Sequence, residues 1–275
     1  MREKDNIPED FRFKKKFGQN FLKDTNLLRA IVSDAGVSGE DNVLEIGAGA
    51  GALTEQICAA TSGKVVSVEV DNTLRDFLTD KFKDTKNLEF IFNDILKVPT
   101  SDIAEYFGGK PFRVVANLPY YISSPIIFYL IESGLNIKSI TVMLQKELVD
   151  RITANPGGKE YGAISVVLSL YGKVKKTRDV PRQMFTPMPN VDSAILSIEI
   201  EPTTLPIAQI SKVVKVCFAM RRKTLVNNLI EGFKMTRDQA NQILEQCGLP
   251  LDIRAEKLDK EQYILLTQKL AQFIK

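Results

Sequence analysis

The sequence predicts an α/β fold with a parallel sheet in a large first domain and a smaller all-helical C-terminal domain. Between residues 43 and 144, short apolar runs alternate with segments of helical apolar spacing, which is typical of strand–helix–strand units with helices on both faces of the sheet. From residue 209 onward the apolar spacing is helical. The 275 residues, 44% hydrophobic and 26% charged, suit one large and one small globular domain.

The individual elements follow from local signals along the chain. The first helix is predicted over residues 24–35, where Leu28 and Ile31 share an apolar face and Asp24 or Thr25 can cap the start. Strands are predicted at residues 43–46, 65–70, 88–92, 113–116, 140–144 and 193–200. Further helices are predicted at residues 53–60, 73–82, 125–132, 210–218, 225–230, 239–244 and 261–273.

The alternation of strands and helices ends at about residue 153. Residues 155–158 form an Asn-Pro-Gly-Gly loop, and residues 164–170 are apolar without a period that separates helix from strand. We therefore expect a domain boundary near residue 201, which separates a first domain, 1–200, from a second, 201–275. The polar tail at residues 1–16 is expected to be mobile.

Missing residue types exclude several chemistries. The chain has no histidine, which removes Ser-His-Asp and Cys-His nucleophile schemes and every zinc site that needs histidine. Its three cysteines form no C-x-x-C pair, so we expect buried thiols and no metal site. The chemistry must therefore depend on a cofactor, on carboxylates or on positioning.

The charge is balanced overall but clustered locally. The net charge is +3, yet residues 1–23 carry seven Lys or Arg against four acids, and further basic clusters lie at residues 171–182 and 221–223. Such clusters favour a polyanion-binding face, although solvated surface charge is the simpler alternative. No apolar run approaches the roughly 18 residues of a membrane span, and the N-terminus lacks a secretory apolar region, so we expect a cytoplasmic protein without a membrane partner. The sequence carries no oligomeric signal, so a monomer is the default expectation.

A glycine-rich segment at residues 45–51 follows a predicted strand and opens a predicted helix. Gly47, Gly49 and Gly51 allow a tight turn and a close approach to a ligand. Glu69 ends the next strand, where a carboxylate can accept both hydroxyls of a ribose. Nicotinamide and flavin enzymes use G-x-G-x-x-G around a pyrophosphate, whereas this spacing is G-x-G-x-G and Glu45 would repel a pyrophosphate. The pattern therefore favours S-adenosylmethionine, which has a sulfonium and an ammonium but no phosphate.

Two further strand ends carry candidate ligand groups. Asp94 follows the third strand, where it could accept a hydrogen bond from the cofactor's adenine amine or simply cap a turn. The fourth strand ends in Asn117, Leu118, Pro119 and Tyr120. The Asn117 amide and a carbonyl of Leu118 or Pro119 could hold the N–H groups of an adenine amine while Tyr120 stacks on the base. Methyl transfer would then depend on proximity and oriented dipoles and would need no histidine base.

These motifs together resemble the ribosomal RNA adenine dimethyltransferases, which include the KsgA-like and Erm enzymes. The resemblance rests on Phe-Gly-Gln-Asn-Phe-Leu at residues 17–22, the glycine segment, Asn-Leu-Pro-Tyr, and Phe-Thr-Pro-Met-Pro-Asn-Val-Asp-Ser at residues 185–193. It implies a Rossmann-like class I methyltransferase domain over residues 1–200. It also implies dimethylation of N6 on two adjacent adenines in the 3′-terminal hairpin of small-subunit (16S) rRNA, with a role in small-subunit biogenesis.

The resemblance also assigns residue roles. Asn20 and Leu22 would contact S-adenosylmethionine, and Gly47, Glu69, Asp94 and Asn117 would complete that site, with Glu45, Gly49 and Gly51 in the same loop. Tyr120 and Phe185 would sandwich the target adenine. The residues expected to contact rRNA are Lys14, Lys15, Lys16, Arg221, Arg222 and Lys223.

One departure and two alternatives accompany this resemblance. Many family members have Asn after Asn-Leu-Pro-Tyr, whereas this chain has Tyr121, which we expect to alter loop packing without abolishing the reaction. An Erm-like enzyme acting on large-subunit rRNA is the first alternative, and the helical C-terminal domain argues against it. The second alternative is a non-catalytic assembly factor that holds the small ribosomal subunit.

Overall fold

The computed structural model describes residues 21–22 and 24–274, and it divides into two compact units. The first comprises the described residues up to Val149 together with Lys175–Ile200, and the second comprises Asp150–Val174 and Glu201–Lys275. The chain passes from the first unit to the second between Ile200 and Glu201, close to the expected boundary near residue 201. The prediction did not include Asp150–Val174, which groups with Glu201–Lys275 in the second unit. The expected tail at residues 1–16 lies outside the described residues.

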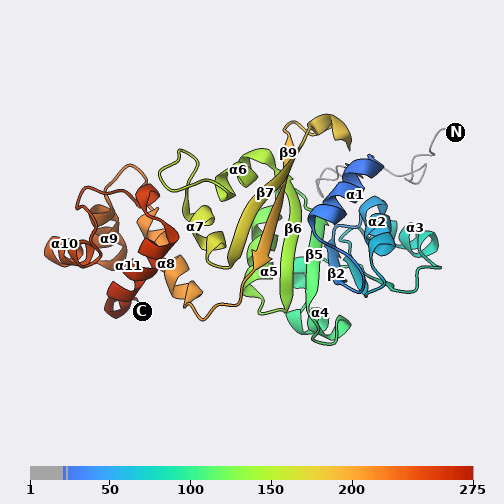
Figure 1. Cartoon of the computed structure of the whole chain (residues 1–275), viewed down its shortest axis with the longest axis horizontal. Coiled ribbons are helices and arrows are strands. Elements are labelled where there is room, and N and C mark those ends of the chain that lie inside the picture. Colours follow the sequence, from blue (N-terminus) through green and yellow to red (C-terminus); the bar gives the residue numbers. More distant parts are fainter. Residues whose placement is uncertain (1–20, 23, 275) are drawn as a thin grey trace. The chain divides into compact units, whose positions relative to one another are not determined.

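A seven-stranded sheet forms the centre of the first unit, in the order β4-β3-β2-β5-β6-β9-β7 (Figure 1). Its strands are β2 (Asn42–Ile46), β3 (Val65–Val68), β4 (Leu88–Ile91), β5 (Phe112–Asn117), β6 (Ile137–Gln145), β7 (Gly172–Val180) and β9 (Ser193–Ile200). Strands β2 to β6 are parallel, and β9 pairs antiparallel to β6. The sheet is therefore mixed, with the predicted parallel part at its core.

The chain reverses its direction of winding between β2 and β5. From β2 it proceeds outward to β3 and β4, then returns to place β5 on the other side of β2, with Ile46 opposite Ala116. Ligands bind outside the carboxyl ends of parallel strands at such a switch point. The ends of β2 and β5 therefore mark the expected place for a site.

Helices cover both faces of the sheet in the first unit. They are α1 (Thr25–Asp34), α2 (Ala52–Ala60), α3 (Arg75–Lys81), α4 (Thr100–Tyr106) and α5 (Ser123–Glu132), with 3₁₀ turns at Asn72–Leu74, Ile95–Lys97 and Arg182–Met184. Figure 1 shows α1 and α2 in front of the sheet and α5 behind it. The Asp24 carboxylate caps α1 by accepting from the Leu27 N–H at 2.9 Å, as the sequence predicted.

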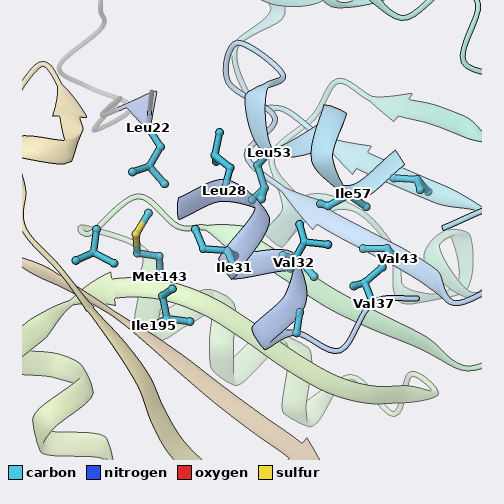
Figure 2. Close-up of a cluster of buried hydrophobic side chains, with 14 of the residues drawn as sticks. Leu22, Leu28, Ile31, Val32, Val37, Val43, Leu53, Ile57, Met143 and Ile195 are labelled. Carbon is cyan, nitrogen blue, oxygen red and sulfur yellow. The ribbon is translucent and has the colours of Figure 1, made fainter. Parts of the chain in front are cut away.

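The front face holds the main apolar core (Figure 2). Leu28 and Ile31 of α1 and Ile57 of α2 pack with side chains of the sheet, including Met143 of β6 and Ile195 of β9. All five are at most 4% exposed. Burying such a side chain stabilises the fold by about 1.5–3 kcal/mol, which explains why the amphipathic pattern of α1 specifies its place.

Several elements differ from the prediction. The predicted helix at residues 73–82 begins as a 3₁₀ turn, and the undecided segment at residues 164–170 is helix α7 (Ala163–Ser169). Elements without a prediction are α4, α6 (Lys146–Ile152), β7 and the two short strands β1 (Phe21–Leu22) and β8 (Phe185–Thr186). Strand β7 was missed because it is an edge strand rich in Lys and Arg, which protect an edge but hide the alternation of apolar residues.

The second unit is mainly helical in its described residues. After α7 it contains α8 (Ile207–Cys217), α9 (Leu225–Phe233), α10 (Arg237–Gln246) and α11 (Lys260–Lys269), with 3₁₀ turns at Ala255–Lys257 and Ala271–Phe273. Tyr263 lies at its centre and donates to the Ala255 carbonyl at 2.8 Å, while Tyr161 donates to Leu258 at 3.0 Å. Burial raises the pKa of Tyr161 to about 12. This unit therefore has a core of its own.

Candidate active site

The glycine segment and the Asn-Leu-Pro-Tyr segment meet at the switch point. Residues 47–51 leave the end of β2, and residues 118–121 leave the end of β5. Gly47 has a positive φ of 87°, and a Cβ placed there would lie 3.5 Å from the Asn117 carbonyl oxygen. The two motifs, far apart in the sequence, therefore lie next to each other at the switch point.

The backbone amides of the glycine loop are hydrogen-bonded to other groups of the protein. Each glycine N–H donates a 2.8 Å hydrogen bond inside the protein: Gly47 to the Val68 carbonyl, Gly49 to the Glu69 carboxylate and Gly51 to the Ala48 carbonyl. A loop that binds pyrophosphate directs such amides at the ligand instead. The three glycine amides therefore provide no cradle for a phosphate, which favours a cofactor without one.

Helix α3 supports the end of this loop. A Cβ on Gly51 would lie 2.5 Å from the Phe82 ring, so no larger residue fits there without displacing it. The Lys81 ammonium donates to the Ala50 carbonyl at 3.1 Å and lies 3.7 Å from the Glu55 carboxylate. Burial lowers the pKa of Lys81, and the Glu55 charge acts in the opposite direction. No pattern in the sequence indicates a role for Lys81, because only the fold brings α3 against the loop.

Glu69 lies at the end of β3 and reaches the glycine loop. Its two carboxylate oxygens accept from the Gly49 and Asp71 N–H groups, each at 2.8 Å. The side chain is nearly buried, and this burial raises its pKa. Because each oxygen has further acceptor capacity, the carboxylate can also accept from a ligand's hydroxyls.

Glu45 lies beneath the loop and is fully buried. Its Oε2 accepts from the Thr54 hydroxyl of α2 and the Ser67 hydroxyl of β3, each at 2.6 Å. Its Oε1 has no hydrogen-bond partner among the described residues. Burial, reinforced by the Glu69 charge, raises the pKa of Glu45 to about 7. The sequence predicts that Glu45 helps to hold the ligand, and this role stays a prediction. In the structure its carboxylate joins β2 to β3 and α2.

Asp94 follows β4 and is partly exposed. Its Oδ1 accepts from the Leu96 N–H at 3.1 Å, which makes it the cap of a 3₁₀ turn, and Lys97 lies 4.0 Å from Oδ2. Burial and the Asp94 charge both raise the pKa of Tyr121, so the phenol and this carboxylate are neighbours. Asp94 therefore has a capping role and lies beside the segment that leaves β5.

The segment after β5 is held at two points. The Leu118 N–H donates to the Met143 carbonyl at 3.3 Å, and the Tyr120 hydroxyl lies 2.6 Å from the Ser193 hydroxyl at the start of β9. Burial raises the pKa of Tyr120. In the sequence, Ser193 is only the last residue of the downstream proline motif. The structure shows that its hydroxyl contacts Tyr120.

Phe185 lies in the apolar core and not at an open surface. It is 4% exposed and packs in the same core as Leu22, its β1 partner in the small β1–β8 sheet. Phe21, next to Leu22, directs its ring at Gly49, where a Cβ would lie 2.8 Å away. The expected stacking of Phe185 on a base stays a prediction, and packing is the role visible for its ring.

The remaining predicted residues divide into two groups. Asn20, Lys14, Lys15 and Lys16 lie outside the described residues. Arg221, Arg222 and Lys223 are exposed in the turn before α9 of the second unit, where Arg221 donates to the Lys159 carbonyl. Within residues 21–22 and 24–274, no cluster of three or more Cys, Asp or Glu could hold a metal ion, and no helix is long and apolar enough to cross a membrane.

A sheet with this strand order, followed at the end of β2 by a glycine loop, is the Rossmann-like fold of class I S-adenosylmethionine-dependent methyltransferases. Two solved structures are similar over 92% of this chain. A dimethyladenosine transferase from Plasmodium falciparum has a TM-score of 0.78 and 26% identity over 98% of its length, and the 23S rRNA methyltransferase ErmE has 0.71 and 25% over its whole length.

The family model of ribosomal RNA adenine dimethylases matches residues 10–272, and the chain belongs to this family. Among its relatives, the ribosomal RNA small subunit methyltransferase A of Streptococcus pneumoniae is 43% identical over 269 residues. The protein of the same name from Bacillus mycoides is 41% identical over 271 residues. Each match covers 94% of this chain and 92% of the relative.

Proposed function

We propose that this chain is a 16S rRNA (adenine-N6,N6)-dimethyltransferase. It transfers methyl groups from S-adenosylmethionine to N6 of two adjacent adenines in the 3′-terminal hairpin of small-subunit rRNA. The observation that carries the proposal is the proximity of the glycine loop to Asn117 at the switch point, where a Cβ built on Gly47 would lie 3.5 Å from the Asn117 carbonyl oxygen. The relatives named small subunit methyltransferase A support the choice of substrate.

The residues at the switch point fit S-adenosylmethionine, which supplies an activated methyl group on its sulfonium. The glycine amides are engaged internally, and this cofactor carries no phosphate that would need them. Glu69 would accept the ribose hydroxyls and Asp94 the adenine amine. When it is ionised, Glu45, whose Oε1 has no hydrogen-bond partner among the described residues, adds negative potential near the loop, which suits a ligand with two cationic groups. Asn20 and Leu22 would complete the expected set of residues that contact the cofactor.

The chain's own residues hold the adenine amine in place. The Asn117 amide oxygen would accept one N–H, and the Leu118 or Pro119 carbonyl the other, so that the nitrogen lone pair points at the methyl group. Tyr120, whose hydroxyl is anchored on Ser193 at 2.6 Å, offers its ring to the base. The proton that N6 loses after methylation can pass to solvent, so no side chain with a pKa suited to a general base is needed. Alignment and fixed dipoles lower the barrier.

The proposal includes a macromolecular partner, the small ribosomal subunit. Lys14, Lys15, Lys16, Arg221, Arg222 and Lys223 would contact the rRNA backbone. The enzyme would act as a cytoplasmic monomer during small-subunit biogenesis. Neutralising Arg221 and Arg222 together should lower the slope of log affinity against log salt by about 2, because each phosphate contact releases about one counterion.

The deciding experiment is methyl transfer from labelled S-adenosylmethionine to unmethylated 30S and 50S subunits in parallel, followed by nucleoside analysis. Dimethyladenine in the 30S reaction alone is expected. Label in the 50S reaction would favour the large-subunit alternative, for which the 25% identity to ErmE is the supporting observation. Label in neither reaction would refute both.

The Asn117→Ala variant separates catalysis from subunit binding. It should bind 30S subunits and transfer no methyl group, whereas Asn155→Ala, at an exposed asparagine of the second unit, should behave as wild type. Full turnover by Asn117→Ala would refute the catalytic assignment. Wild-type protein that binds 30S without transfer would favour the assembly factor.

A further inference from the structure

The large apolar side chains left exposed are concentrated on two segments beside the candidate active site. Among the described residues there are five: Tyr121 at 60%, Met188 at 57%, Val191 at 43%, Leu251 at 42% and Met184 at 38%. Four of these lie at residues 117–122 or 184–193, the segments that carry Asn-Leu-Pro-Tyr and the downstream proline motif. Exposed apolar groups gathered near a site indicate a contact surface.

The two segments emerge from the same end of the sheet. Asn117, at the end of β5, pairs with Met143 of β6, and Gln145, at the end of β6, pairs with Ser193, the first residue of β9. The 2.6 Å contact between the Tyr120 and Ser193 hydroxyls joins the segments directly. Tyr121 and the loop that precedes Ser193 are therefore held on either side of this contact.

The downstream loop is fixed at its base. The Arg182 N–H donates to the Asp192 carboxylate at 3.0 Å, and the Lys146 N–H donates to the Asp192 carbonyl at 3.0 Å. Between these anchors, Met188 and Val191 remain in solvent. Because hydrogen bonds hold the base of the loop, Met188 and Val191 are exposed on a loop whose two ends are fixed.

The charge of the loop indicates what would cover this surface. The Arg182 guanidinium donates to the Asn190 carbonyl at 3.4 Å, and it forms no ion pair with a carboxylate in the described part of the chain. An apolar surface beside a guanidinium that no carboxylate neutralises among the described residues, next to groups that would bind an adenine amine, suits RNA. When the target base leaves its stack, its neighbours lose a stacking partner, and apolar or aromatic side chains can replace it.

We propose that Tyr121, Met184, Met188 and Val191 form a base platform that contacts the unstacked rRNA nucleobases next to the target adenine. This inference rests on the proposed function. It gives Tyr121, which stands where many family members have Asn, a role as a flat surface for a base. Arg182 contacts a phosphate of the same strand.

The test compares Met188→Ser and the Met188→Ser/Val191→Ser pair with wild type, and uses Leu251→Ser, at the exposed apolar position of the second unit, as the matched control. The measurements are KM and kcat on unmethylated 30S subunits, equilibrium binding to 30S by sedimentation, and the affinity for S-adenosylhomocysteine. Thermal unfolding checks that each variant is folded.

We expect KM and the 30S dissociation constant to rise about ten-fold in the double variant, the equivalent of about 1.4 kcal/mol, with kcat and the S-adenosylhomocysteine affinity unchanged. The salt dependence of 30S binding should keep its wild-type slope in Met188→Ser and fall by about 1 in Arg182→Gln. This contrast separates base contact from phosphate contact.

Unchanged 30S binding in the double variant would overturn the platform, and so would an equal loss in Leu251→Ser or a parallel loss of S-adenosylhomocysteine affinity. A concentration-dependent dimer of the free protein that Met188→Ser abolishes would instead assign the surface to a second copy of the chain. Wild-type protein that binds 30S without methylating it refutes the proposed function while the variants still test the platform. Wild-type protein that does not bind 30S refutes both.

Discussion

Glu45→Gln tests whether the acid beneath the glycine loop carries a proton at neutral pH. Glu45 is fully buried, two hydroxyls donate to its Oε2, and its Oε1 has no partner among the described residues. Burial raises its pKa from 4.5 to about 7. Glutamine keeps the shape and the acceptor oxygen but cannot ionise.

The sign of the effect follows from the raised pKa. The folded state binds the proton more tightly than the unfolded state, so Glu45 stabilises the fold most below pH 4.5, and this contribution is lost as the pH rises through about 7. A rise of about 2.5 pKa units corresponds to about 3 kcal/mol between these limits. Relative to wild type, Glu45→Gln should therefore be more stable by about 1 kcal/mol at pH 5 and by about 3 kcal/mol at pH 8.

The assay is urea unfolding followed by circular dichroism at pH 5, 6, 7 and 8. The difference between the two proteins isolates Glu45, because all other titrating groups are shared. Glu40→Gln, at an exposed glutamate, serves as the control for removing one carboxylate. A difference between wild type and Glu45→Gln that does not change with pH would refute the reasoning.

Three further substitutions test the rest of the site. Glu69→Ala should weaken binding of S-adenosylhomocysteine in calorimetry by about 1.5–3 kcal/mol, because charge-assisted hydrogen bonds are lost, and unchanged affinity would refute the ribose role. Lys81→Met should raise the KM for S-adenosylmethionine several-fold, because the Ala50 carbonyl of the glycine loop loses its hydrogen bond from Lys81. The exposed control Lys83→Met should leave this KM unchanged. Equal effects of the two substitutions would mean that the contact between Lys81 and the loop does not matter for cofactor binding. Tyr120→Ala should lower kcat on 30S subunits more than it lowers cofactor affinity, and an equal loss in both would indicate a structural role.

The sequence determined the parts of the fold that depend on short-range patterns. Strand β2, the glycine loop and α2 were predicted because an apolar run, positive-φ glycines and helical spacing lie within 20 residues. The meeting of Asn117 with the glycine loop was also predictable. The carboxyl ends of parallel strands share one edge, so motifs at those ends must converge.

Tertiary structure alone decided what those side chains face. Glu45 and Glu69 are both acids at strand ends, yet Glu45 points to two buried hydroxyls and Glu69 to a loop amide, a difference set by neighbours from α2 and β3. Phe185 is in the core because Leu22, from the other end of the unit's sequence, pairs with it. The packing of Asp150–Val174 with the C-terminal helices was equally hidden. Local sequence patterns determine the periodicity of an element and where it ends. Burial depends on contacts between residues that are distant in sequence, and a single sequence does not show these contacts.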